Sequence, residues 1–224
     1  MEIPLFPLPS LVLFPDVIVP LHIFEERYKT MVNACIENGE PFGLIQLRDG
    51  AQEETEQTIH RVGTTAHVIE VERLVGGRMN ILCRGELRFR VARFLANEPV
   101  WNAEVNVFED EFADSKSLAP LAAEVASLYR KAFALGIQLN AASPSELKLP
   151  DSPVELSCMV SFVLDIPPTE KQRLLEMRST EERLRVLVEH VDQAISKLEQ
   201  QLVHKALNRK VHGNGDLGKP GSHH

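Results

Sequence analysis

Hydrophobic residues follow two different patterns along this chain, and the change falls near residue 110. Before it, apolar residues form short runs or alternate with polar ones, and turn-forming residues separate the runs. After it, apolar residues recur at every third or fourth position over long stretches. Alternation is typical of β-strands, and the wider spacing is typical of amphipathic helices. The pattern therefore predicts a β-rich first half and a helical second half.

In the first half the short apolar runs predict strands, and one stripe at helical spacing predicts a helix over residues 24–38. Prolines interrupt the first three runs, so we expect edge strands or bends there, because proline lacks the N–H that a strand ladder needs. Gly76 and Gly77 predict a tight hairpin, and Gly85 with Glu86 predicts a bend or bulge. The predicted strands cover residues 3–6, 11–14, 17–21, 42–47, 62–74, 79–83, 87–94 and 100–108.

In the second half, capping sequences mark where helices begin. Ser152, Pro153 and Glu155 combine an N-cap serine, a first-turn proline and a glutamate three residues after the serine. Ser179 and Glu182 repeat the spacing before the last helix. That helix carries one continuous apolar stripe, which indicates packing on the other helices, with a coiled-coil partner as the alternative. The predicted helices cover residues 118–139, 153–164, 169–177 and about 180–207.

Together these elements predict an α+β protein built from two units. Residues 1–112 are expected to form a small β-barrel or folded sheet with one helix. Residues 113–207 are expected to form an α-helical bundle. Residues 208–224 are rich in glycine and poor in apolar residues, which predicts a disordered tail.

Composition and charge narrow the classes of protein. An apolar fraction of 44% is ordinary for a globular protein and excludes wholesale disorder. No apolar run approaches the roughly 20 residues of a membrane-spanning helix, and no secretory signal pattern begins the chain. The three cysteines form no CxxC pair and no disulfide framework, so we expect a cytoplasmic protein. A net charge of −8 argues against general nucleic-acid binding.

Motifs for metal, cofactor or nucleophilic chemistry are missing from the sequence. His22 and Glu26 have a spacing that places both on one helix face, but no third ligand accompanies them. No GxSxG elbow is present, and the cysteines lie in apolar stripes as core residues do. We therefore predict no cofactor, no metal and no enzyme activity. A hydrolase would need a catalytic site assembled from distant residues.

One basic feature stands out, because Arg84, Arg88, Arg90 and Arg93 lie close together. Arg88 and Arg90 have the same parity and so share a strand face. A solvated face paired with neighbouring glutamates explains this cluster. The alternatives are a phosphate-binding strip on a small barrel and a surface for a partner protein.

Several runs together resemble one known family. Residues 3–9 read IPLFPLP, residues 13–15 LFP, residues 20–28 PLHIFEERY, residues 62–64 VGT, residues 85–90 GELRFR, residues 171–176 KQRLLE and residues 183–184 RL. In this order they are similar to the N-terminal domain of the Lon protease family, over about residues 2–205. Asp16 departs from the resemblance, because the family usually has glycine there. Glycine tolerates a positive φ, and aspartate adopts it at some cost.

The resemblance implies a β-barrel similar to the PUA superfamily, followed by a helical bundle. In Lon this unit precedes an ATPase ring and a Ser–Lys protease domain, and neither is present in this sequence. We therefore expect a stand-alone protein that neither hydrolyses ATP nor cuts peptides. The family unit is implicated in substrate recognition and subunit assembly, which implies that this chain binds polypeptide.

Edge strands and the junction of the two units suggest how polypeptide would bind. Edge strands marked by proline offer unpaired backbone groups to an extended segment. The junction between barrel and helices offers a concave apolar groove. We place the candidate polypeptide-binding site near Phe14, Leu21, Phe24 and Tyr28, side chains that core packing also explains.

Two functions from different classes follow. The first is a non-catalytic polypeptide-binding module that acts as an adaptor for unfolded or regulated proteins. The alternative is an RNA-binding module, by analogy with PUA-like barrels, in which Arg84, Arg88, Arg90 and Arg93 contact phosphates. No membrane partner is expected, and the oligomeric state and the partner's identity stay open.

Overall fold

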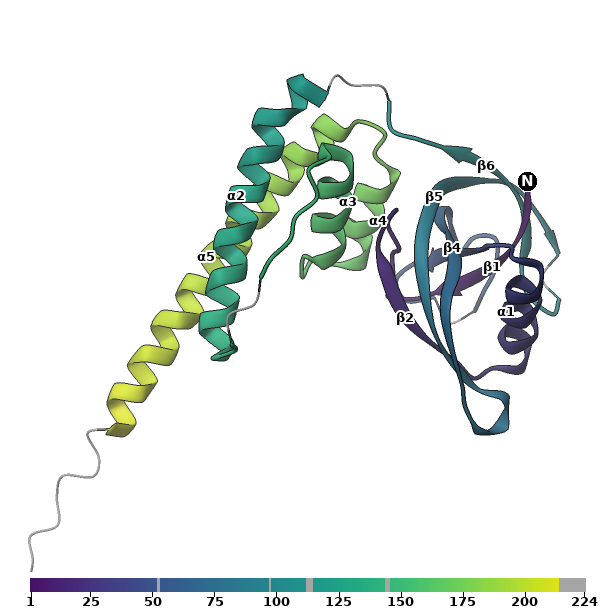
Figure 1. The fold of residues 1–224 in the computed structure, drawn as a ribbon, viewed down its shortest axis with the longest axis horizontal. Helices are drawn as coiled ribbons and strands as arrows, with labels where there is room; N and C mark the ends of the chain where they lie inside the picture. The colour runs from purple at the N-terminus through teal and green to yellow at the C-terminus, as the bar shows by residue number, and fades with distance from the viewer. Residues whose placement is uncertain (52, 97, 112–114, 144–145, 214–224) are drawn as a thin grey trace, which may run out of the picture.

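The computed structural model describes residues 1–51, 53–96, 98–111, 115–143 and 146–213. Strands and one helix form a barrel on one side, and the remaining helices form a bundle on the other (Figure 1). The predicted α+β class is confirmed. The barrel contains β1 (Glu2–Leu8), β2 (Ile18–Ile23), α1 (Glu26–Asn38), β3 (Phe42–Leu47), β4 (Ile59–Arg73), β5 (Met79–Ala96) and β6 (Asn102–Phe108). The helical bundle contains α2 (Ser115–Asn140), α3 (Pro153–Val163), α4 (Pro168–Glu176) and α5 (Thr180–Gly213).

The strand order leaves β2 outside a closed ring. The sheet order is β2-β5-β4-β3-β1-β6, and an additional pairing of β5 with β6 closes the last five strands into a barrel. β2 and β6 share one edge of β5, because β2 pairs with residues 79–84 and β6 pairs with residues 88–96. Within the described residues β2 therefore has one neighbouring strand and one free edge.

The expectation that proline marks edge strands is right for β2 and wrong for β1, which lies between β3 and β6. β1 pairs with β6 over Glu2–Pro4 and with β3 over Leu5–Leu8. The N–H of Leu5 donates to the carbonyl of Trp101, next to β6. Backbone groups of residues two apart in a strand point to the same side, so Pro7 also faces the β6 side, beyond the residues that pair with β6. Pro4 faces the β3 side before that pairing begins. Each proline therefore stands where the ladder needs no donor.

The structure differs from two further strand predictions. Residues 11–14 form no strand, and Val12, Leu13 and Phe14 instead bury their side chains from an irregular segment. The runs 79–83 and 87–94 belong to one strand, β5. The bulge predicted near Gly85 is confirmed as a register shift, since Thr64 lies opposite Arg88 while Ala66 lies opposite Gly85.

Helix starts follow the predicted caps. The side chain of Ser152 accepts a hydrogen bond from the N–H of Glu155, with Pro153 in the first turn of α3. α5 continues past residue 207 to Gly213, so the helix is longer than predicted. The rest of the expected tail, residues 214–224, and the 112/113 boundary between the expected units lie outside the described residues. The division into units at that boundary stays a prediction.

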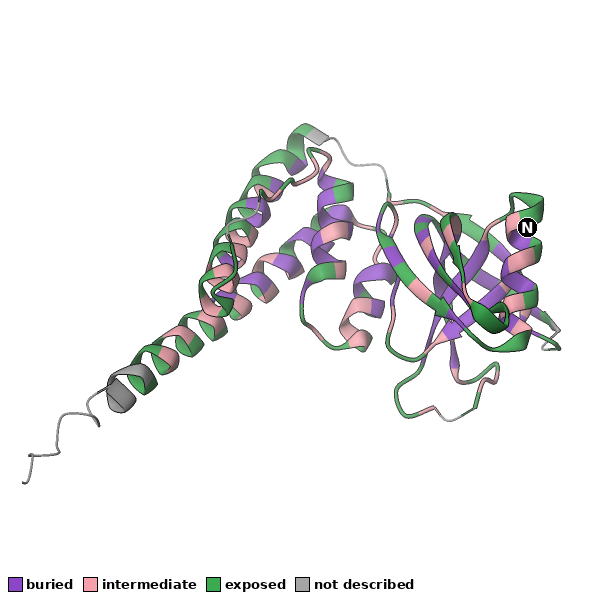
Figure 2. Ribbon diagram, turned by 60° about the horizontal axis from the view of Figure 1, so that its bottom comes forward, coloured by how far each residue is buried: buried purple, intermediate pink, exposed green. Residues whose placement is uncertain are grey.

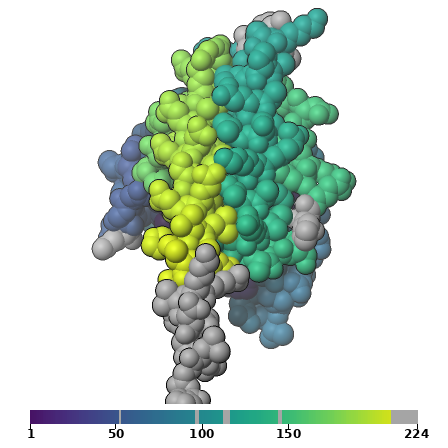
Figure 3. Space-filling view, turned by 90° about the vertical axis from the view of Figure 1, so that its left-hand side faces the viewer, coloured from purple at the N-terminus to yellow at the C-terminus, as the bar shows by residue number. Residues whose placement is uncertain are grey.

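The buried hydrophobic side chains form two clusters, and one of them includes residues of both the barrel and the bundle. Buried residues accordingly lie in both parts of the ribbon (Figure 2). The shared cluster includes Phe14 and Ile23 of the barrel, side chains of α1, Leu156 of α3 and Val191 of α5. α2 and α5 lie side by side on the outer face of the bundle (Figure 3). Beyond Ile195, the described part of α5 has no buried side chain. The predicted packing of its stripe on other helices is confirmed up to that point.

Candidate functional site

The free edge of β2 presents backbone groups that form no hydrogen bond with any described residue. The N–H of Gly85 donates to the carbonyl of Val17 over 2.9 Å, which fixes the odd-numbered residues of β2 as those that bond to β5. The even-numbered residues Ile18, Pro20 and His22 therefore direct their backbone groups away from β5. Because proline has no N–H, the edge offers two donors, from Ile18 and His22, and three carbonyl acceptors.

The same even-numbered residues place their side chains on the outer face of the barrel. Ile18 is 52% exposed and Phe24, just beyond the strand, is 60% exposed. The imidazole of His22 stacks on Phe24, with ring centroids 5.9 Å apart, and its Nδ1 lies 2.7 Å from Oδ1 of Asn80. We refer to Ile18, Pro20, His22 and Phe24 as the β2 strip. It is a narrow exposed surface with apolar side chains at both ends.

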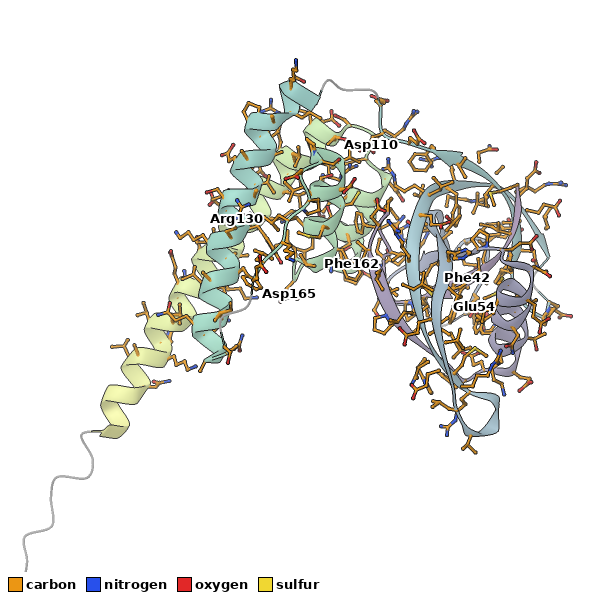
Figure 4. All side chains as sticks on the ribbon, viewed as in Figure 1. Phe42, Glu54, Asp110, Arg130, Phe162 and Asp165 are labelled. Atoms are coloured by element: carbon orange, nitrogen blue, oxygen red, sulfur yellow. The ribbon has the colours of Figure 1, made fainter. Side chains whose placement is uncertain are left out.

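A groove continues the β2 strip toward the helices. It has a volume of about 660 Å³ and lies between residues 15–18 of the barrel and α3 with the segment before it. Figure 4 shows Phe162 on the side of α3 that faces the barrel. The apolar residues that line the groove are Pro15, Val17, Ile18, Leu149, Pro150, Met159, Phe162 and Val163. The predicted apolar groove at the junction is therefore present, with other lining residues than we expected.

The charges around this groove largely balance each other. Nη2 of Arg84 lies 2.7 Å from a carboxylate oxygen of Asp16. Lys148 and Glu155 lie on the opposite wall. Two cationic and two anionic side chains leave the groove without a net charge. Such a surface suits an uncharged segment better than a polyanion.

The four residues predicted for polypeptide binding do not share one surface. Phe14 and Tyr28 are core residues with 1% and 2% exposure, and the Tyr28 ring stacks on Phe6 at 4.1 Å. Leu21 is half-buried on the inner side of β2. Phe24 is exposed and belongs to the β2 strip. Our sequence analysis missed Ile18, Pro20 and His22. Their even numbers, shared with Phe24, were the available signal, because every second residue of a strand lies on the same face.

The four predicted arginines are also separated. Arg84, Arg90 and Arg93 are exposed, whereas Arg88 is buried. Arg88 and Arg90 do share a strand face, because both guanidinium groups lie over the ring of Phe108, at 4.7 and 6.0 Å. Arg93 lies 3.4 Å from a carboxylate oxygen of Glu104. These arginines therefore form no single exposed strip.

Arg88 is buried because it joins the barrel to the helices through Asp110. Asp110 follows β6 at the junction of the two parts (Figure 4), and its carboxylate accepts hydrogen bonds from Arg88, Arg183 and Thr180. Arg88 also donates to the backbone carbonyl of Leu175 at 3.0 Å. We refer to Arg88, Asp110, Thr180 and Arg183 as the junction cluster.

The junction cluster keeps its charges by mutual compensation. Burial acts to raise the pKa of the Asp110 carboxyl, but the hydrogen bond and charge of Arg183, with Thr180 and Arg88, outweigh it and lower that pKa. Burial lowers the pKa of Arg88, and the charge of Asp110 opposes the shift. Our sequence analysis missed this cluster, because its members are far apart in the chain.

The cysteines are buried thiols. Burial raises the pKa of Cys35 to about 11 and that of Cys83 to about 12, and it also raises the pKa of Cys158. Thiols with such pKa values carry almost no thiolate at neutral pH, and the thiolate is the nucleophile. In the described part of the chain, no group of three or more His, Cys, Asp or Glu residues is arranged to hold a metal ion. No described helix is long and apolar enough to cross a bilayer.

Comparison with known proteins identifies the family. The family model described as "ATP-dependent protease La (LON) substrate-binding domain" matches residues 2–193. The chain belongs to this family, and the resemblance found in the sequence is confirmed.

Several Lon proteases are similar to this chain. Lon protease 2 of Herpetosiphon aurantiacus is 29% identical over 201 residues, which cover 89% of this chain and 24% of that protein. A Lon protease of Azospirillum brasilense is 27% identical over 213 residues, which cover 93% of this chain and 25% of that protein. The chain therefore spans about a quarter of the length of the curated relatives that it matches.

Solved structures support the fold. A crystal structure of a Lon N-terminal domain protein from Xanthomonas campestris has a TM-score of 0.61 and 24% identity, covering 84% of this chain and 97% of that one. The N-terminal domain of a Mycobacterium avium complex Lon protease has a TM-score of 0.60 and 22% identity, covering 86% and 98%. At these identities the likeness shows a shared fold.

Proposed function

We propose that this chain is a non-catalytic polypeptide-binding module that takes up unfolded or regulated proteins as an adaptor. One observation carries the proposal: the free edge of β2, the β2 strip and the apolar groove are continuous with one another. Free backbone groups bind any extended chain, and apolar surface beside them favours a chain that exposes apolar residues. Folded proteins bury most such residues and pair their backbone groups, so an unfolded segment fits this surface best.

The description of the family also supports polypeptide binding, because it names a substrate-binding domain. The balanced charges at the groove and the pairing of three of the arginines with carboxylates favour polypeptide over RNA. The buried, protonated cysteines favour a role without nucleophilic catalysis.

The test is a binding titration with permanently unfolded, reduced and carboxymethylated α-lactalbumin that carries a fluorescent label. Fluorescence anisotropy should show binding to the unfolded protein and none to native α-lactalbumin. Phe24→Ser removes an exposed side chain that packs on His22, so it should weaken binding several-fold without changing the thermal midpoint. Val75→Ser is the matched control, because Val75 is 87% exposed at the tip of the β4–β5 hairpin, away from the groove.

Equal losses in both variants would remove the β2 strip from the binding site. Affinity for the unfolded protein should change little between low and high salt, because apolar contacts and backbone hydrogen bonds are weakly screened. Tight binding of a labelled single-stranded RNA that falls steeply with salt, with a salt slope that the Arg90→Ala/Arg93→Ala double variant lowers, would support the RNA-binding alternative instead.

A further inference from the structure

We propose that the bound segment joins the barrel as an additional strand along the free edge of β2. This inference rests on the proposed function, because it states how the polypeptide is held. The occupant is an extended stretch of an unfolded protein with apolar residues at alternate positions.

The backbone groups of the edge define what the segment must supply. The N–H groups of Ile18 and His22 need carbonyl acceptors, and the carbonyls of Ile18, Pro20 and His22 need N–H donors. An antiparallel segment of five residues supplies all of them, through its first, third and fifth residues. The central one donates to the carbonyl of Pro20 and receives nothing, because proline has no N–H. The pairing therefore comprises five hydrogen bonds over roughly 17 Å of strand.

The side chains beside the edge define which residues the segment prefers. In an antiparallel pair, residues directly opposite each other place their side chains on the same face. Residues opposite Ile18, Pro20 and His22 therefore extend the β2 strip on the outer face. The residue opposite Ile18 also lies next to the groove, whose far wall includes Met159 and Phe162. An aliphatic or aromatic side chain at this position would bury apolar surface of Ile18 on one side and of the groove wall on the other.

The charges argue against a strongly charged segment. Asp16 and Arg84, the charged residues on the barrel side of the groove, are already paired over 2.7 Å. A charged side chain beside this pair would lose its hydration without gaining a free partner on the barrel side. The segment is therefore apolar and near neutral at its centre.

The first measurement reads the edge directly in the wild-type protein. Hydrogen exchange followed by NMR should show the amides of Ile18 and His22 exchanging quickly without ligand and slowly with a bound peptide of alternating valine and threonine. The amides of Val19 and Leu21 bond to β5 in both states, so they serve as internal controls. Unprotected Ile18 and His22 amides in a saturated complex would overturn the inference.

The second measurement blocks the edge. His22→Pro removes one edge donor, while the ladder to β5 is kept because His22 does not bond to it. Pro20 shows that this strand accepts proline at an outward position, and the extended backbone of Leu21 is compatible with a following proline. His22→Ala is the matched control, since it also removes the imidazole but keeps the N–H. The proline variant should bind the peptide about tenfold more weakly than the alanine variant.

The outcomes separate this inference from the proposed function. If wild-type protein binds neither the peptide nor unfolded α-lactalbumin, the proposed function fails. If it binds both, but His22→Pro and His22→Ala bind equally well, polypeptide binding stands and strand addition fails. Protection of the Ile18 amide without peptide, together with a dimer in sedimentation, would show that a second copy of the chain covers the edge and would also overturn the inference.

Discussion

Arg183 of α5 and Asp110 after β6 form an ion pair in which both side chains are almost fully buried, with 1% and 8% exposure. The two residues come from different parts of the molecule, and Arg88 of β5 shares the same carboxylate. A single negative charge therefore holds two buried arginines, one from the barrel and one from the bundle. This carboxylate therefore helps to fix the orientation of the two parts, together with the buried cluster that they share.

Replacing Asp110 with asparagine should destabilise the protein strongly. Asp110→Asn leaves two buried guanidinium groups without a counter-charge, and breaking a buried pair of this kind costs about 3–5 kcal/mol. Urea unfolding followed by circular dichroism measures the loss. Glu104→Gln is the control, because Glu104 pairs with Arg93 on the surface and such pairs contribute less than about 1 kcal/mol. Similar losses in both variants would contradict the role assigned to Asp110.

Acid should weaken the junction cluster. The pKa of Asp110 is lower in the folded protein than in the unfolded chain, so its contribution to stability is complete above the unfolded pKa, near 4. The contribution is lost as the pH falls through the lower, folded value. Urea midpoints of wild type and Asp110→Asn should therefore converge from pH 6 toward pH 3. A difference that stays constant over this range would show that the carboxylate charge is not the source of the stability.

Two glycine-to-alanine substitutions should change the free energy of unfolding in opposite directions. A β-carbon at Gly85 would lie 2.3 Å from the carbonyl oxygen of Phe14, so the backbone has to move and Gly85→Ala should cost at least about 1–3 kcal/mol. A β-carbon at Gly136, inside α2, meets nothing within 4 Å. Gly136→Ala should therefore stabilise the protein by about 0.5–1 kcal/mol, because alanine favours the helix. Urea unfolding measures both, and a stable Gly85→Ala variant would contradict the close approach of residues 14 and 85.

Asp16 has a left-handed backbone with a φ of 62°, a conformation that glycine adopts more easily than aspartate. Asp16→Gly and Asp16→Ala both lose the ion pair with Arg84, and they differ only in the β-carbon. The alanine variant should be about 1 kcal/mol less stable than the glycine variant, because the β-carbon disfavours this conformation. Equal unfolding free energies would show that the turn relaxes to another conformation.

The sequence was sufficient to predict those elements that depend on residues close together in the chain. Strand β3 has the predicted bounds, and the caps of α3 follow from Ser152, Pro153 and Glu155, because capping involves residues a few positions apart. The glycine turn at residues 76–77 and the unusual backbone at Asp16 are also matters of local conformation. Family membership followed from motifs that are read in order along the chain.

The site depended on packing between distant segments. Parity shows that Phe24 shares a face with Ile18, and that Arg88 shares one with Arg90, but it does not show which face another segment covers. The closure of β5 with β6 leaves β2 outside the ring, and Asp110 with Arg183 covers Arg88. Phe14 is buried and Phe24 is exposed because a distant segment covers the first side chain and not the second. The sequence pattern around each residue does not show this difference.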